Sequence, residues 1–378
     1  MQTIHQTATS LRTAAAEASA VAAEHAGASE RQRRLAPAVV EALTGAGFAR
    51  HLVPARWGGT EGGYAELAAA VAEVGEGCGS AGWCAAVYAI AGRVGAHLPE
   101  EGQQELWAAG PDTLIASGIV PAPGARVEPV AGGWRLTGEW PFASGVRGAD
   151  WLFVGALAQV GEGREFRFFA VPRGMATVRD TWDNVGLSGT GSDTVVLSEV
   201  LVPEHRSFGY DALLRGEPVG SVAACHTVPY KLVNGLMFVS PVLGAARGAQ
   251  RHWQNWIGGK FEVGGKPTRE RGSVQEALAR TAAELDLAEM LVTRAADAAD
   301  LGDRSALTLA RSPRDFAVAT DLLATATARL LRSGGARAQT RENPVQRAWR
   351  DVHAAAGHVV LQFDSAAAAY AEQVFAGV

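Results

Sequence analysis

The chain has little that is typical of a nucleic-acid-binding protein or of a membrane protein. Its 34 lysines and arginines are outnumbered by 39 aspartates and glutamates, which gives a formal net charge of −5. Basic residues do not cluster with aromatic residues, and no apolar run reaches the roughly 18 residues that span a bilayer. The first residues also lack the basic and apolar regions of a secretion signal. We therefore expect a soluble, cytoplasmic protein whose partners are small molecules or other proteins.

Cysteine is scarce as well. The chain has three cysteines, Cys78, Cys84 and Cys225, and an odd number without CxxC spacing predicts neither a disulfide framework nor a zinc site. Two common glycine-rich nucleotide motifs, GxGxxG after a strand and GxxxxGK(S/T), are also absent. The chain therefore shows no sign of an NAD(P)H or ATP site of its own.

The pattern of apolar residues divides the chain into three parts. At 378 residues it is long enough for two or three hydrophobic cores. Residues 1–112 and 211–378 are alanine-rich, with apolar residues at helical spacing, whereas residues 113–210 alternate short strand-like runs with glycine-rich turns. This pattern predicts an α+β fold with an N-terminal helical domain, a middle β-barrel or sandwich domain, and a C-terminal four-helix-bundle domain.

Two segments of the middle part carry residues that a simple β domain does not require. Trp140, Phe142 and Ser144 recur at every second position, so in a strand they would share one face. Thr190 and Ser192 stand among glycines in a loop whose backbone could closely approach a planar or anionic ligand. These residues are either ordinary core and turn residues or the wall of a binding site.

A stripe of polar residues marks the last helical part. On a helix, Arg347 and Asp351 would each lie within about 20° of His358. The stripe is either a structural Arg–Asp ion pair beside a satisfied histidine or the rim of a site.

Several segments, in this order, resemble the acyl-CoA dehydrogenase fold. The resemblance is strongest to its oxygenase branch, the flavin-dependent two-component monooxygenases, which include hydroxylases of 4-hydroxyphenylacetate, of steroid catabolites and of polyketides. The segments that carry it are Pro54-Ala-Arg-Trp-Gly-Gly59, Ser80-Ala-Gly-Trp83, Gly138-Glu-Trp-Pro-Phe-Ala-Ser-Gly145, Val185-Gly-Leu-Ser-Gly-Thr-Gly-Ser-Asp193, Val202-Pro-Glu-His-Arg206 and Pro344-Val-Gln-Arg-Ala-Trp-Arg-Asp351.

The resemblance favours an oxygenase over a dehydrogenase. Acyl-CoA dehydrogenases commonly have a Glu-Gly-Thr stretch after the Arg-Asp element, where a carboxylate removes a proton. This chain reads Ala354-Ala-Ala-Gly-His358 there, and a histidine at this place matches the oxygenase branch. An FAD-dependent acyl-CoA dehydrogenase and a flavin-free binding or scaffold subunit are the alternatives.

The resemblance also implies a cofactor and roles for the site residues. An oxygenase of this branch would take reduced FMN, or FAD, from a separate NAD(P)H:flavin reductase and act through a C4a-hydroperoxyflavin. Phe142 would flank the flavin ring, Ser144 would bond to its N5, and His358 would handle the peroxide proton, which suits a side chain with a pKa near 6.5. Further cofactor contacts implied in this way are Trp140, Ser117, Thr190, Ser192 and, from a neighbouring subunit of a homodimer or homotetramer, Arg337.

The substrate pocket that the resemblance implies is apolar or aromatic. Its wall would consist of Trp83, Tyr88, Met237 and Phe238. Phenol hydroxylases of this branch often carry a histidine about nine residues after the Gly-Trp pair, where this chain has Ile90-Ala-Gly92. We therefore expect an aromatic substrate that is already electron-rich, such as a natural-product intermediate, or an amine nitrogen as in amine N-oxygenases of this fold.

Overall fold

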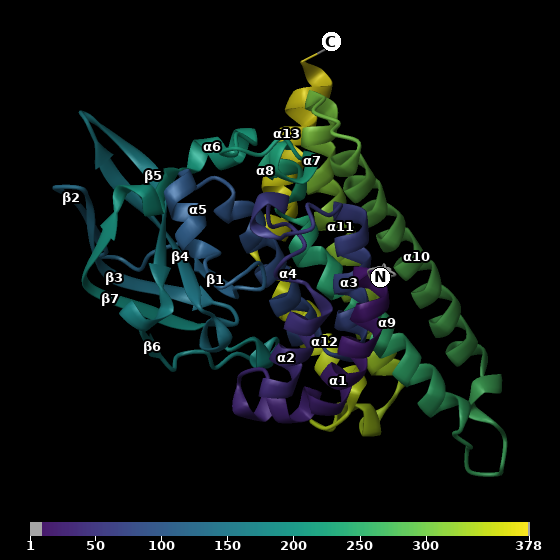
Figure 1. Ribbon diagram of the computed structural model, residues 1–378. Helices are drawn as coiled ribbons and strands as arrows, with labels where there is room; N and C mark the ends of the chain where they lie inside the picture. Colours follow the sequence, from purple (N-terminus) through teal and green to yellow (C-terminus); the bar gives the residue numbers. More distant parts are fainter. Residues whose placement is uncertain (1–9, 377–378) are drawn as a thin grey trace, which may run out of the picture.

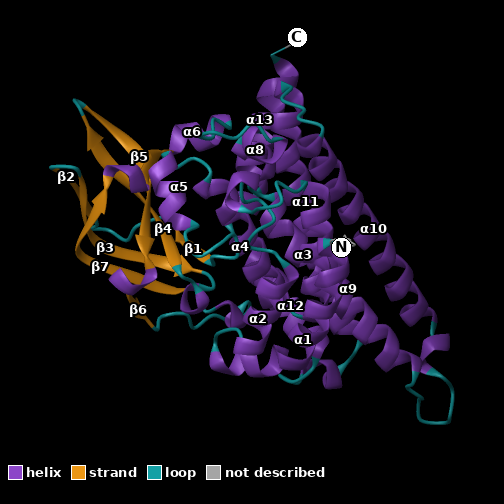
Figure 2. Cartoon of the chain, in the orientation of Figure 1, coloured by secondary structure: helices purple, strands orange, loops and turns teal. Residues whose placement is uncertain are grey.

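A computed structural model describes residues 10–376 of the chain. Figures 1 and 2 show a β domain on one side and a larger body of helices on the other. The changes from helices to strands and back fall between α5 and β1 and between β8 and α6. The predicted α+β order of helices, strands and helices is confirmed.

The first helical part surrounds one very apolar helix. Every residue of α4 (Gly79–Gly95) is buried, because it packs against other helices and against the β domain. Helix α2 begins at Pro37 and is capped at its C-terminal end by Gly47, whose positive φ of 91° is typical of a left-handed helix end. The helices of this part are α1 (Leu11–Gln32), α2 (Pro37–Ala46), α3 (Tyr64–Gly77), α4 and α5 (Glu100–Leu106).

Two four-stranded sheets form the middle part, with strand orders β1-β4-β5-β8 and β2-β3-β7-β6. A second hydrophobic core, which includes Trp140, lies between them. The strands are β1 (Ile115–Gly118), β2 (Arg126–Val130), β3 (Gly133–Ala143), β4 (Trp151–Val160), β5 (Gly163–Pro172), β6 (Thr177–Arg179), β7 (Asp193–Pro203) and β8 (Ser207–Gly209).

The C-terminal part is built on long helices that pack against one another and against α3. Residues 230–258, which include α9, form the one helical segment among the described residues that is long and apolar enough to cross a membrane, and 83% of its most apolar stretch is buried inside the protein. Such burial is typical of a core helix in a soluble protein. The helices of this part are α6 (Tyr210–Arg215), α7 (Ala224–Thr227), α8 (Tyr230–Val233), α9 (Leu236–Gly258), α10 (Gly272–Asp300), α11 (Ala306–Ser333), α12 (Pro344–Ala356) and α13 (Phe363–Phe375).

Candidate active site

Three aromatic rings from distant parts of the chain meet beside α4. The ring of Trp83 lies 4.9 Å from that of Phe238 on α9 and 5.6 Å from the imidazole of His358, measured between centroids. Phe238 and His358 stack at 4.2 Å. The structure thus brings together three of the predicted site residues.

His358 is held as a neutral imidazole. It lies just after α12, where its Nδ1 accepts a hydrogen bond from the backbone N–H of Val360 at 3.4 Å. Burial lowers the pKa of His358 to about 4, so the ring carries one proton at neutral pH. Because Nδ1 is the acceptor, that proton is on Nε2. His358 can therefore donate from Nε2 at neutral pH, because burial disfavours the charged ring and lowers its pKa from the usual value near 6.5.

A row of hydroxyl groups continues from this cluster into the β domain. The indole N–H of Trp83 donates to Ser144 Oγ at 3.1 Å, and Ser144 Oγ lies 2.8 Å from Ser192 Oγ. Ser192 Oγ lies 2.7 Å from Thr190 Oγ1, which donates to the carbonyl of Leu187 at 2.8 Å. Ser144, Thr190 and Ser192, predicted from separate segments, thus form one hydrogen-bonded row.

Phe142 has an unusual backbone and an exposed side chain. Its φ of 65° lies in the left-handed region, which an aromatic residue rarely adopts, and its side chain is 67% exposed. The ring packs edge-on against Trp182 at 6.2 Å. A strained residue that presents an aromatic ring to solvent indicates a binding surface rather than a core position.

The prediction that Trp140, Phe142 and Ser144 share one strand face was wrong. The pairing of β3 with β7 shifts register between Trp140 and Ala143, and this irregularity breaks the alternation. Trp140 points into the core between the sheets, where its N–H donates to the carbonyl of Gly155 at 2.8 Å. It cannot reach a ligand from there.

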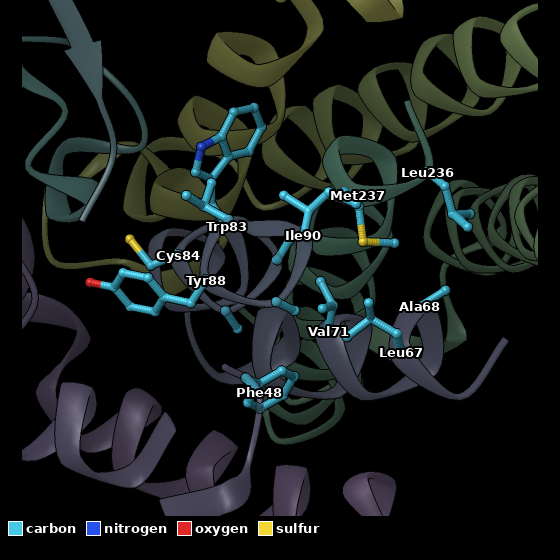
Figure 3. Close-up of a cluster of buried hydrophobic side chains, with 14 of the residues drawn as sticks. Phe48, Leu67, Ala68, Val71, Trp83, Cys84, Tyr88, Ile90, Leu236 and Met237 are labelled. Carbon is cyan, nitrogen blue, oxygen red and sulfur yellow. The ribbon is translucent and has the colours of Figure 1, made fainter. Parts of the chain in front are cut away.

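Two of the predicted substrate contacts also belong to the core. Tyr88 lies about 140° around α4 from Trp83, and Figure 3 shows the two rings on different sides of the helix. The Tyr88 hydroxyl donates to the carbonyl of Gly145 at 2.9 Å. Met237 is 1% exposed among buried aliphatic side chains. Trp83 and Phe238 remain predicted substrate contacts, whereas Tyr88 and Met237 are core residues.

The polar stripe of Arg347, Asp351 and His358 does not form one helix face. Helix α12 ends at Ala356, before His358. Arg347 Nε bonds to Glu30 Oε2 at 2.8 Å, while Asp351 Oδ1 accepts the backbone N–H of Leu187 at 2.6 Å. The alternative of a structural Arg347–Asp351 ion pair is therefore wrong, because each side chain has a partner from another element.

The two remaining predicted cofactor contacts, Ser117 and Arg337, are not fully buried and so are accessible to a ligand. Ser117 is half-buried on β1 and shares its strand face with Ile115, which belongs to the core of the helices. Arg337 is exposed on the 3-10 turn Ala336–Gln339 that joins α11 to α12, and it stays a predicted contact of a neighbouring subunit's cofactor.

Three residues of this site were not predicted. They are Trp182, Leu187 and Ile90. The carbonyl of Leu187 has no sequence signal, and Ile90 lies about 20° from Trp83 on α4. The last could have been found, because seven residues separate it from Trp83 on a helix.

The residues fit a flavin. Exposed Phe142, with the half-buried ring of Trp182 edge-on against it, offers a surface for a planar ring. Ser144 has two hydrogen-bond partners and keeps one lone pair. Nearby, His358 carries its proton on Nε2, because Nδ1 accepts from Val360, so Nε2–H can donate to a ligand. A planar cofactor with polar ring nitrogens needs such a set of groups.

Comparisons with known proteins agree with a flavin site in this fold. Residues 5–109 match the family described as acyl-CoA dehydrogenase, N-terminal domain, and residues 236–363 match acyl-CoA dehydrogenase, C-terminal domain. The flavin-dependent monooxygenase, oxygenase subunit HsaA, of Mycobacterium tuberculosis (strain ATCC 25618 / H37Rv) is 33% identical, over 89% of this chain and 87% of its own. The FADH(2)-dependent resorcinol hydroxylase, oxygenase component, of Rhizobium sp. (strain MTP-10005) is 34% identical with the same coverage. The crystal structure of 3-HSA hydroxylase from Rhodococcus sp. RHA1 superposes with a TM-score of 0.91 at 26% identity, over 98% of this chain and 97% of that one.

Proposed function

From the premise that this chain belongs to the oxygenase subunits of flavin-dependent monooxygenases with the acyl-CoA dehydrogenase fold, we propose its substrate class and the roles of its site residues. The substrate is a small, electron-rich aromatic molecule. The overall reaction is RH + O2 + reduced flavin → ROH + H2O + oxidised flavin, in which one oxygen atom enters the substrate and the flavin supplies two electrons.

The contact between the aromatic cluster and the hydroxyl row carries this proposal. Trp83 belongs to both, since it touches His358 and Phe238 through its ring and Ser144 through its N–H. A substrate beside Trp83 would therefore lie next to a flavin held at Ser144. Oxygen transfer needs this closeness and the exclusion of water that the apolar rings provide.

Each polar group then has one task. Reduced flavin, when bound, supplies the electrons that activate dioxygen. Ser144 accepts a hydrogen bond from the cofactor, and Phe142 with Trp182 packs against its ring. His358 holds a proton on Nε2 and delivers it at the reacting oxygen. Ser117, Thr190 and Ser192 line or support the cofactor site.

The substrate class follows from what surrounds Trp83. Ile90 lies on the same face of α4 as Trp83, and it begins the stretch Ile90-Ala-Gly92, where phenol hydroxylases of this branch often have a histidine. The next histidine in the sequence, His97, lies just after α4, is buried and packs at a tilt against Phe208, with its pKa lowered to about 3 by burial. A phenol would therefore lack a base to remove its proton, which favours rings that are electron-rich without ionisation.

The cofactor arrives reduced from a separate NAD(P)H:flavin reductase. The name of the resorcinol hydroxylase, an oxygenase component that depends on FADH2, supports this division of labour and makes FAD as good a candidate as FMN. A cytoplasmic homodimer or homotetramer belongs to the same proposal.

One experiment tests the proposed function. The purified chain is mixed with a flavin reductase, NADH and FMN or FAD under ¹⁸O2, and indole, resorcinol and phenol are offered in turn. We expect hydroxylated indole or resorcinol that carries ¹⁸O, with little product from phenol. If every substrate is recovered unchanged and all oxygen appears as hydrogen peroxide, the proposed function is wrong.

A further inference from the structure

The hydroxyl row beside the aromatic cluster can hold its protons in one order only. At one end, Thr190 Oγ1 lies 2.8 Å from the carbonyl oxygen of Leu187, which can accept but not donate. Two oxygens at this distance need a proton between them, so the proton of Thr190 points to Leu187. This end fixes the direction of the whole row.

The next protons follow from the first. Because Thr190 has used its proton, the short contact with Ser192 at 2.7 Å requires Ser192 to donate to Thr190. Ser192 then has no proton left for Ser144, so Ser144 donates to Ser192 across 2.8 Å. At the other end, the indole N–H of Trp83 can only donate, and it does so to Ser144. Hydrogen bonds therefore run one way from Trp83 to Leu187.

Ser144 is left able to accept one further hydrogen bond and unable to donate one. Its proton is committed to Ser192, one lone pair receives the N–H of Trp83, and one lone pair is free. The two redox states of a flavin differ at N5, because reduced flavin carries an N–H there and oxidised flavin a bare nitrogen that only accepts. An acceptor at Ser144 satisfies the first state and opposes the second.

We propose that Thr190 and Ser192 are positioning residues that fix Ser144 as an acceptor and thereby make this site select reduced over oxidised flavin. The inference rests on the proposed placement of flavin N5 at Ser144. It concerns a shared need of two-component oxygenases, in which the cofactor must arrive reduced and leave oxidised. The hydroxyl row thus favours binding of reduced flavin and release of oxidised flavin without a movement of the chain.

The surroundings of the row hold it rigid. Thr190 is 2% exposed and Ser192 is 4% exposed, so water does not compete for their hydrogen bonds. The carbonyl of Thr190 accepts the backbone N–H of Gly145 at 2.8 Å, which ties the loop after β3 to the loop before β7. Asp351 holds the N–H of Leu187, so the acceptor at the end of the row is fixed as well. A rigid row cannot reverse when the flavin changes its redox state.

The test measures binding rather than turnover. Dissociation constants of oxidised FMN and FAD, and of the same flavins reduced anaerobically with dithionite, are determined for the wild type and for Thr190→Val. We expect the wild type to bind reduced flavin at least about tenfold more tightly than oxidised flavin. Valine has the shape of threonine without its hydroxyl, so Ser192 can turn its proton to Ser144 and make Ser144 a donor. The ratio of the two constants should then fall about tenfold, which corresponds to ~30 mV in the midpoint potential of the bound flavin.

Two further variants separate this role from a merely structural one. Thr190→Ser keeps the hydroxyl and should keep the wild-type ratio. Ser192→Ala frees the proton of Ser144 directly and should lower the ratio as Thr190→Val does, and it stands in if the valine variant does not fold. An unchanged ratio in the variants that lack a hydroxyl overturns the inference and leaves the proposed function standing, provided that the wild type binds reduced flavin. Failure of the wild type to bind any flavin would overturn both.

Discussion

The carboxylate of Asp351 accepts a hydrogen bond from the backbone N–H of Leu187 at 2.6 Å, across 164 residues of sequence. Leu187 has a positive φ of 53°, and its carbonyl accepts hydrogen bonds from the side chains of Thr190 and Trp182. One carboxylate on α12 therefore fixes the loop on which the hydroxyl row ends. The C-terminal helices set the geometry of a site whose hydroxyls all belong to the β domain.

Substituting Asp351 should change how stability depends on pH. Burial raises the pKa of Asp351 to about 6, above its value of about 3.9 in an unfolded chain. The native state then holds a proton that the unfolded state has lost, so this group's contribution is fully present below about pH 4 and is lost as pH rises through about 6. Asp351→Asn keeps an acceptor for Leu187 and cannot ionise. Relative to wild type, its free energy of unfolding should rise between pH 4 and 7 by about 2 to 3 kcal/mol.

Urea denaturation at a series of pH values measures this difference. His358 titrates in the same range with the opposite sign, because burial lowers its pKa, so the comparison between variant and wild type is the informative quantity. Asp351→Ala serves as the control, since it also removes the acceptor and should cost about 1 to 3 kcal/mol by leaving a buried N–H unpaired. A difference between Asp351→Asn and wild type that does not vary with pH would show that Asp351 ionises normally.

Removing the imidazole of His358 should uncouple oxygen consumption from hydroxylation. Without the Nε2–H, a positioned proton donor is lost, which typically costs a factor of about 10² to 10⁴ in the step it serves. We expect His358→Ala to consume reduced flavin and release hydrogen peroxide while product falls at least about tenfold. The matched control is His353→Ala, because His353 is exposed on α12 and contacts Trp349, through its carbonyl and its ring. Equal coupling in the two variants would remove the role of His358.

Coupling should also be insensitive to mild acid. Because the pKa of His358 is lowered to about 4, the neutral ring with its Nε2 proton persists from about pH 8 down to about pH 5. The ratio of product to hydrogen peroxide, measured between pH 5.5 and 8, should therefore stay constant within about twofold. A midpoint near pH 6.5 that disappears in His358→Ala would show that the ring titrates normally.

Phe142→Gly should raise stability and weaken flavin binding. A non-glycine residue in the left-handed region costs about 1 kcal/mol, and glycine removes this cost, although it adds freedom to the unfolded chain. The side chain is exposed, so little core packing is lost. Thermal unfolding without flavin should therefore show an equal or higher midpoint, whereas the dissociation constant of reduced flavin should rise. Phe142→Leu, which keeps the strain and loses the aromatic face, should weaken binding without the gain in stability.

Features of the fold and the site could be predicted from the sequence where they depend on residues close together in the chain. The order of helices, strands and helices was predicted correctly, because apolar periodicity depends only on nearby residues. Ser144 and His358 were found through a resemblance, and the structure places both beside Trp83. The prediction that Trp140, Phe142 and Ser144 share one strand face was wrong because a register shift depends on the partner strand. The periodicity of one segment cannot reveal such a shift.

The prediction of a polar stripe on one helix face was wrong for a related reason. Arg347 and Asp351 are correctly spaced for an ion pair on one helix, but Glu30 and Leu187 compete for them from distant parts of the chain. The direction of hydrogen bonds in the hydroxyl row was equally hidden, because it depends on a backbone carbonyl with no side-chain signature.

Introducing a histidine at Ile90 should extend the substrate range to simple phenols. Ile90 is 9% exposed and lies on the face of α4 that carries Trp83, so an imidazole there could accept the phenol proton as oxygen is transferred. We expect Ile90→His to raise product from phenol at least about tenfold and to leave the oxidation of indole unchanged or slower. Ile90→Gln supplies a polar side chain of similar size that cannot act as a base near neutral pH, and it should not produce this gain. Product formed per molecule of reduced flavin consumed is the quantity to compare, because it corrects for changes in flavin affinity. If the glutamine variant accepts phenol as well as the histidine variant does, then polarity rather than proton removal limits the substrate range, and the proposed reason for preferring electron-rich rings is wrong.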